Sequence, residues 1–161
     1  MVKKKSSPKK KSAAKKAASL GRIQNRRARF DYELGDSLVV GMSLTGRETK
    51  ALRLKHGHLR GAYVNVLSDE LWLVGATVGN APGIILTTDE QTRSRKLLAK
   101  RREISQLVAA RQQGRTIVPL EILTNGRYVK LRISVGKGKR QYDKRQQLKE
   151  RDQQRDAQRL S

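Results

Sequence analysis

The sequence lacks several residue types and patterns on which whole classes of protein depend. It has no cysteine, which excludes disulfides, thiolate metal ligands and a cysteine nucleophile. Only two histidines are present and aromatic residues make up 4%, so neither metal chemistry nor an extensive base-stacking platform is expected. No apolar run approaches the roughly 18 residues of a membrane span, and the basic N-terminus lacks the apolar segment of a signal peptide. These absences predict a cytoplasmic protein with no membrane partner.

Acidic residues are also scarce. The 161 residues include 37 Lys and Arg against 14 Asp and Glu, which gives a formal net charge of +23. A length of this order suits one domain, and a charge of this size indicates a polyanionic partner.

The charge divides the chain into three parts. Residues 1–22 contain many Lys and few large apolar side chains, which predicts a disordered basic arm. Residues 137–161 are good helix formers without an apolar stripe for docking on a core. We therefore expect this tail to be disordered in the free protein and helical against a partner. Residues 23–136 are left to form the folded domain.

The middle of the chain is predicted to be mostly β with short helices. Alternating or continuous apolar runs predict strands at 29–34, 38–44, 59–66 and 70–78, and Asn125 with Gly126 joins two further strands in a hairpin. Pro119 suggests an edge position in that hairpin. Thr45 and Glu48 have the spacing of a capping box at the start of a helix over 46–55, and 79–91 is expected to be a loop. This pattern favours an OB-fold-like closed antiparallel barrel with flanking helices over a sandwich.

A longer helix is expected over residues 93–113, where Leu97, Ile104 and Leu107 share one face. Leu98 lies off that face among arginines. It therefore has two interpretations: contact with a second core wall, or an apolar contact at the edge of a basic binding face.

Candidate catalytic and metal sites are weak. His56 and His58 have no Cys or carboxylate partner nearby in the sequence, and the run from Gly136 to Lys139 lacks the spacing of a phosphate-binding loop. No nucleophile motif or acid–base pair is visible, so the sequence predicts neither an enzyme nor a cofactor or metal site.

Five sequence blocks, in order and with ordinary spacing, resemble the bacterial SsrA-binding protein family, also called small protein B. The blocks are NRRARFDYEL, LTGRETKALR, RSRKLLAKRREI, VPLEILTNGRYVKLRI and GKGKRQYDKR followed by LKERD. The resemblance implies an OB-fold barrel that binds the tRNA-like domain of transfer-messenger RNA. It also implies delivery of that RNA to ribosomes stalled on messages without a stop codon, a process called trans-translation.

Three positions match RNA-binding residues of the family. The resemblance implies that Asn25 contacts base edges or ribose, that Lys130 contacts phosphate, and that Leu98 is part of the RNA-binding surface. Each also has a structural interpretation: Asn25 as a cap at the entry to a strand, Lys130 as a solvated sheet residue, and Leu98 as core. One position departs from the family, because Val39 stands where an acidic residue that matters for RNA binding is usual.

The tail matches the family segment that enters the vacant decoding centre and the empty mRNA path, where it folds into a helix. The matching residues are Gly138, Lys139, Tyr142, Asp143, Lys144 and Arg145. Tyr142 is suited to stacking on an unpaired base, and Lys144 and Arg145 to contacts with rRNA phosphate. The alternative for the whole chain is a general rRNA-binding or ribosome-associated protein. In either case we expect a monomer when the protein is free.

Overall fold

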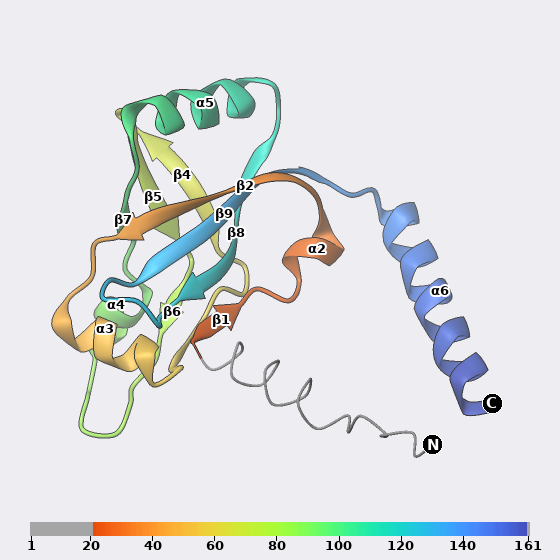
Figure 1. Ribbon diagram of the computed structural model, residues 1–161, viewed down its shortest axis with the longest axis horizontal. Helices are drawn as coiled ribbons and strands as arrows, with labels where there is room; N and C mark the ends of the chain where they lie inside the picture. Colours follow the sequence, from red (N-terminus) through yellow and green to blue (C-terminus); the bar gives the residue numbers. More distant parts are fainter. Residues whose placement is uncertain (1–20, 161) are drawn as a thin grey trace, which may run out of the picture.

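The computed structural model describes residues 21–160, which are mostly β with five helices (Figure 1). Most of the predicted basic arm, residues 1–20, lies outside the described residues. In chain order the elements are β1 (Arg22–Gln24), α2 (Ala28–Asp31), β2 (Tyr32–Met42), α3 (Gly46–Arg53), β3 (Gly57–His58), β4 (Tyr63–Leu67), β5 (Glu70–Val74), β6 (Thr77–Val78), α4 (Thr88–Thr92), β7 (Arg95–Leu98), α5 (Arg101–Gln112), β8 (Thr116–Leu123), β9 (Lys130–Gly138) and α6 (Gln141–Leu160). Within residues 21–160, no helix has both the length and the apolar character needed to cross a membrane.

Seven of the strands form one antiparallel sheet. Their order is β1-β8-β4-β5-β7-β2-β9, and β9 also pairs with β8. Strand β9 therefore forms backbone hydrogen bonds along both of its edges, with β2 on one side and β8 on the other. Strands β3 and β6 form a separate pair. The predicted hairpin around Asn125 and Gly126 is confirmed by the pairing of β8 with β9.

The core lies inside the curved sheet, and strand alternation explains its composition. In β9, Leu131 and Ile133 are fully buried, whereas Lys130 is exposed and Arg132 half-buried. Three helices lie at the ends of the sheet, α5 at one end and α3 with α4 at the other (Figure 1). Leu107 of α5 is buried and Ile104 packs against the core, so this helix covers one end.

Helix α3 begins as predicted. The Thr45 side chain accepts a hydrogen bond from the Glu48 N–H at 3.3 Å, and the Thr45 N–H donates to Glu48 Oε2 at 2.9 Å. These two bonds form the capping box, so the sequence signal at this helix start is confirmed.

The predicted strand at 29–34 is wrong in its first half. Residues up to Asp31 form helix α2, and the chain then runs as one long strand, β2, through the expected turn into the 38–44 segment. The pairing of β2 with β9 shifts register between Leu34 and Ser37, and the Ser134 hydroxyl lies 3.0 Å from two carbonyl oxygens in this irregularity. A bulge therefore absorbs the turn-forming residues without ending the strand.

The predicted helix over 93–113 is wrong over its first third. Arg95 to Leu98 form β7, which pairs with β5 and β2, and the helix begins only at Arg101. Strand alternation places Leu97 in the core and Leu98 outside it. The 79–91 loop is likewise interrupted, because α4 begins at Thr88 behind a second capping box.

The expected edge position of Pro119 is also wrong. Strand β8 pairs with β9 along one edge and with β4 and β1 along the other. Pro119 lies where the register with β9 shifts, just before Glu121, and between the stretches that pair with β4 and with β1. Proline lacks an N–H to donate, and a bulge is the other place in a sheet that tolerates it.

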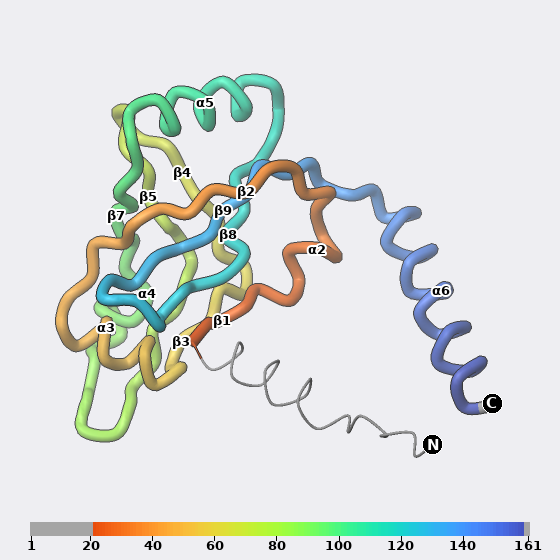
Figure 2. Tube along the Cα trace, viewed as in Figure 1, coloured from red at the N-terminus to blue at the C-terminus, as the bar shows by residue number. Residues whose placement is uncertain are grey.

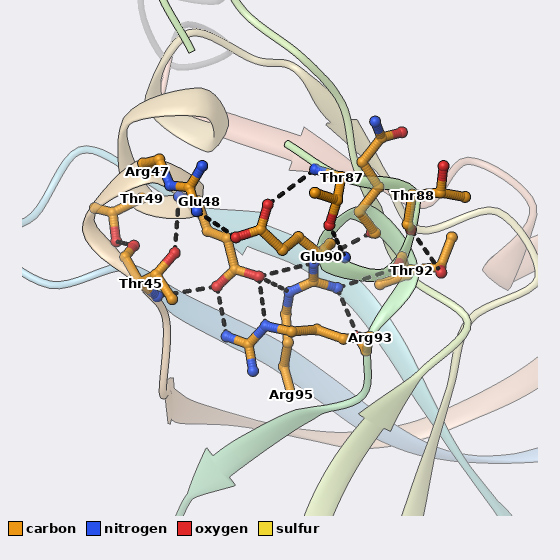
Figure 3. Close-up of polar contacts among 12 residues, drawn as sticks. Thr45, Arg47, Glu48, Thr49, Thr87, Thr88, Glu90, Thr92, Arg93 and Arg95 are labelled. Carbon is orange, nitrogen blue, oxygen red and sulfur yellow. Dashed lines mark hydrogen bonds and ion pairs between the residues drawn. The ribbon is translucent and has the colours of Figure 1, made fainter. Parts of the chain in front are cut away.

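An ion cluster around the buried Glu48 and Arg95 fixes the start of β7 (Figure 3). Arg93 donates to both carboxylate oxygens of Glu48, at 2.7 and 2.6 Å, and Arg95 donates to Glu48 Oε1 at 3.1 Å. Arg95 is fully buried and also donates to the carbonyl oxygens of Ala76 and Glu90. These partners hold Arg95 in the sheet, which explains why a segment with helical apolar spacing becomes a strand.

We expect Glu48→Gln to lower the free energy of unfolding by roughly 3 to 5 kcal/mol, because it leaves two guanidinium groups without their carboxylate. Burial by itself raises the pKa of the Glu48 carboxyl, but hydrogen bonds from Arg93 and the Thr45 N–H and the charge of Arg95 outweigh it. The net pKa therefore lies below the ordinary 4.5. The ionised Glu48 carboxylate therefore stabilises the fold at a pH above the pKa that this group has in the unfolded chain. This stabilisation is lost as the pH falls through the lower pKa of the folded state.

Urea denaturation between pH 7 and pH 3 measures both effects, and the variant should lose less stability on acidification than the parent. The control is Glu70→Gln, whose pair with Lys96 is solvent-exposed and should contribute less than about 1 kcal/mol. Equal stability of Glu48→Gln and Glu70→Gln would contradict a structural role for the cluster.

Candidate RNA-binding surface

The register of the sheet gathers the predicted RNA-binding residues on one side. We call this side the outer face, and it consists of two rows that each cross several strands. One row contains Gln24, Glu121, Arg132 and Val39, and the other contains Arg22, Leu123, Lys130, Gly41 and Leu98. The residues between the two rows point into the core and are buried, namely Ile23, Ile122, Leu131 and Val40, and Leu97, which precedes Leu98 in β7, is buried as well. The outer face is therefore the solvent side of β1, β8, β9, β2 and β7.

Leu98 and Lys130 flank the same residue of β2. Gly41 pairs with Leu98 of β7 and with Lys130 of β9, so the two side chains stand two strand spacings apart, roughly 10 Å. Leu98 is 55% exposed, which excludes the core interpretation and leaves the surface one. A Cβ on Gly41 would lie only 3.2 Å from the Leu98 Cβ, so the glycine makes room for Leu98 to pack over β2.

Val39 is on the same face and is 40% exposed. It pairs with Arg132, whose other neighbour in the row is Glu121 of β8. Arg132 donates to Glu121 Oε1 at 2.6 Å. The carboxylate partner of Arg132 on this face therefore comes from β8, while β2 contributes an apolar side chain.

Asn25 follows β1 at the margin of the outer face. Its backbone N–H donates to the Leu120 carbonyl at 2.7 Å, and its side-chain Nδ2 donates to the Pro119 carbonyl at 2.9 Å. The structural interpretation, a cap at the entry to the strand region, is therefore present in the molecule. The same two bonds fix the position of the side chain beside Arg26, in the turn before α2, and Arg29 of α2.

Those arginines line a hollow of about 290 Å³ next to the outer face. Its walls come from β1, β8, β9 and the turn into α2, and the lining residues are Arg22, Gln24, Asn25, Arg26, Arg29, Leu120, Glu121 and Arg132. Four guanidinium groups against one carboxylate make this hollow a strong attractor of anions.

The tail is attached to α2 at its root. Gly138 ends β9 and pairs with Tyr32. The Lys139 N–H then donates to the Asp31 carbonyl at 2.9 Å, and the Lys144 Nζ lies 3.0 Å from the Asp31 carboxylate. Asp31 thus contacts the tail both before and within α6.

Helix α6 leaves the sheet beyond β9 and has α2 as its neighbour (Figures 1 and 2). Tyr142 is 74% exposed, and Asp143 and Arg145 are exposed as well. Of the predicted tail residues, Tyr142, Asp143, Lys144 and Arg145 therefore lie in the first turns of α6, whereas Gly138 ends β9 and Lys139 lies between the two elements. That the tail is disordered until it meets a ribosome stays a prediction.

The sequence did not single out Arg22, Glu121 or Arg132. The signal for Arg132 was present, because it alternates with buried residues in β9 in the same way as Lys130. The ion pairs of Glu121 required knowledge that β1 and β9 flank β8. Within residues 21–160, no group of three or more His, Cys, Asp or Glu side chains is placed to hold a metal ion.

Comparison with known proteins shows the family to which the chain belongs. The family model described as SmpB protein matches residues 22–161. The chain is 39% identical over 137 residues to the SsrA-binding protein of Protochlamydia amoebophila, a match that covers 84% of this chain and 90% of that protein. It is 42% identical over 139 residues to the SsrA-binding protein of Paracoccus denitrificans, covering 85% and 89% of the two chains.

A solved structure described as "tmRNA-SmpB: a journey to the center of the bacterial ribosome" contains a similar chain. That chain superposes with a TM-score of 0.62 at 33% identity, and the match covers 75% of this chain and 86% of the other. Family, relatives and fold agree over most of the described residues, and the chain belongs to the SmpB protein family.

Proposed function

We propose that this protein binds the tRNA-like domain of transfer-messenger RNA and brings it to stalled ribosomes for trans-translation. The observation that carries the proposal is the row in which Lys130, Gly41 and Leu98 are in register across three strands, beside Asn25 and the arginine hollow. The proposed role is binding, without a catalytic step.

The chemistry of this surface suits a folded RNA. A tRNA-like elbow is recognised by its shape and backbone with few exposed bases, and the outer face offers cations around one exposed leucine. Lys130 is placed to meet phosphate, and Leu98 to pack on a ribose or an unstacked base. Asn25 keeps its Oδ1 for a donor on the RNA while its Nδ2 binds the Pro119 carbonyl.

We propose that the sheet is an OB-like closed barrel. The pairing that runs from β8 through β4, β5, β7 and β2 to β9, and from β9 again to β8, supports closure. A closed sheet has no free edge for pairing with other chains, which suits a protein that presents its strands to RNA.

We propose that the tail occupies the vacant decoding centre and mRNA path, with small-subunit rRNA as its partner. Tyr142 is exposed for stacking on a base, and Arg145 for a phosphate contact. Lys144 would exchange the Asp31 carboxylate for rRNA phosphate, so the tail can leave α2 without losing a charge partner.

Competition binding tests the function. The tRNA-like fragment should displace labelled fragment at much lower concentration than bulk rRNA or duplex RNA. Equal competition by all three RNAs would instead indicate a general rRNA-binding protein.

The outer face has its own prediction. Lys130→Ala should weaken fragment binding and flatten the slope of log K against log salt by about 0.7 to 0.9, the loss of one phosphate contact. Arg115→Ala, which removes the same charge from an exposed position outside the two rows, should change the slope less. Leu98→Ala should weaken binding with an unchanged slope and little loss of stability, because the side chain is exposed.

Removal of residues 141–161 separates the two halves of the mechanism. Fragment affinity should be almost unchanged, while tagging of stalled nascent chains in a reconstituted translation system should collapse. Within the intact tail, Tyr142→Ala should remove a stacking contact of about 1 to 3 kcal/mol and slow tagging alone. Loss of fragment binding on truncation, or tagging that survives it, would contradict this division of roles.

A further inference from the structure

Glu121 is a buried acid in the middle of a basic surface. Only 6% of the residue is exposed, although it belongs to a row of the outer face. Its two carboxylate oxygens are divided between neighbouring strands: Oε1 accepts from Arg132 Nη1 of β9 at 2.6 Å, and Oε2 from Arg22 Nη1 of β1 at 3.3 Å. A carboxylate placed in this way fixes two guanidinium groups that the backbone alone leaves free to rotate.

The two guanidinium groups are partly solvent-exposed, with 33% of the Arg22 side chain and 39% of the Arg132 side chain accessible. Both line the hollow that also contains Arg26, Arg29 and Asn25. Arginine presents planar forks of N–H donors that match a phosphate, and this hollow collects four of them around a volume of about 290 Å³.

We propose that the hollow binds a backbone phosphate of the tRNA-like domain and that Glu121 is the positioning residue of this site. The inference rests on the proposed function and deepens it. Arginine side chains lose much rotamer freedom when they bind, and a partner that orders them beforehand reduces that entropic cost. Glu121 holds Arg22, which is in the same row as Lys130, and Arg132, which is in the neighbouring row. One stretch of RNA backbone can therefore contact both the hollow and the row that contains Lys130.

The position of Val39 strengthens this assignment. Arg132 stands between Val39 on β2 and Glu121 on β8. Because β2 offers an apolar side chain there, the ion pair that orders Arg132 is the one with Glu121. A positioning acid is therefore required on β8 if Arg132 is to be held toward the hollow.

Charge and positioning predict opposite results for Glu121→Gln. The substitution adds one net positive charge, so an acid that only neutralises the surface would give tighter RNA binding when it is removed. An acid that positions the arginines gives weaker binding: we expect a loss of roughly three- to tenfold in affinity for the tRNA-like fragment. Glu33→Gln makes the same change of charge at an exposed position of β2 outside the two rows and should leave affinity unchanged or slightly higher.

A mutant cycle tests whether Glu121 affects RNA binding through Arg22 and Arg132. Arg22→Ala and Arg132→Ala should each weaken binding and together lower the salt slope by about 0.7 to 0.9, the value for one phosphate contact, and Glu121→Gln should weaken binding no further in the double-arginine variant. An unchanged slope in the double-arginine variant would overturn the inference, whatever the stability of the Glu121 variant. Equal losses from Glu121→Gln with and without the arginines would also overturn it, because the acid would then act on folding.

These outcomes are distinct from failure of the proposed function. If the parent protein prefers the tRNA-like fragment but Glu121→Gln binds it more tightly or equally well, the function stands and the positioning role is wrong. If the parent protein shows no preference for that fragment over bulk rRNA, the proposed function fails and the inference about this phosphate fails with it.

Discussion

Strand β9 is hydrogen-bonded along both edges, and this double pairing determines both the core and the binding surface. Its register with β2 and β8 sends Leu131 and Ile133 inward and Lys130 and Arg132 outward. A slip of one residue would bury two cations and expose two core side chains, so the register is strongly specified. The same backbone bonds that stabilise the sheet therefore align Lys130 with Gly41 and Leu98, and Arg132 with Val39.

Helix α2 connects the proposed RNA-binding face to the tail. Arg29 of α2 and Arg26 of the preceding turn line the hollow, while Asp31 contacts Lys139 and Lys144 of the tail. A short helix can hold two such segments in place relative to each other only if its own position is fixed. The hydrogen bonds from Asn25 to β8, immediately before α2, provide that fixed point.

Local signals in the sequence predicted the elements that local interactions determine. The capping box at Thr45 and the turn at Asn125 depend on neighbours within a few residues, and both predictions are confirmed. The prediction of a helix over the whole of 93–113 was wrong because Arg95 is buried against Glu48, which is 47 residues away in the sequence. Strand pairing at Arg95 then overrides the helical spacing of the apolar residues. The exposure of Leu98 was left open for the same reason, since only the pairing with Gly41 decides which face it occupies. The resemblance to a family predicted Asn25, Leu98 and Lys130 as RNA-binding residues. The ion pairs around Glu121 could be predicted only from the order of the strands.

In a chain with a net charge of +23, folding brings some cationic side chains close together. The two buried glutamates lie where strands or loops that are distant in the sequence bring arginines together. Glu48 joins Arg93 and Arg95, and the fully buried Arg95 also donates to backbone carbonyl oxygens, so this ion cluster contributes to folding. Glu121 joins arginines that still face the solvent, so it relieves their mutual repulsion while leaving N–H donors for a ligand. Burial distinguishes the two sites only through Arg95, whose fully buried guanidinium contributes to stability, because the Arg93 side chain is 38% exposed, much as those of Arg22 and Arg132 are. Arg22 and Arg132 differ from Arg93 in that they line one hollow with further arginines, where partly exposed guanidinium groups can also bind phosphate.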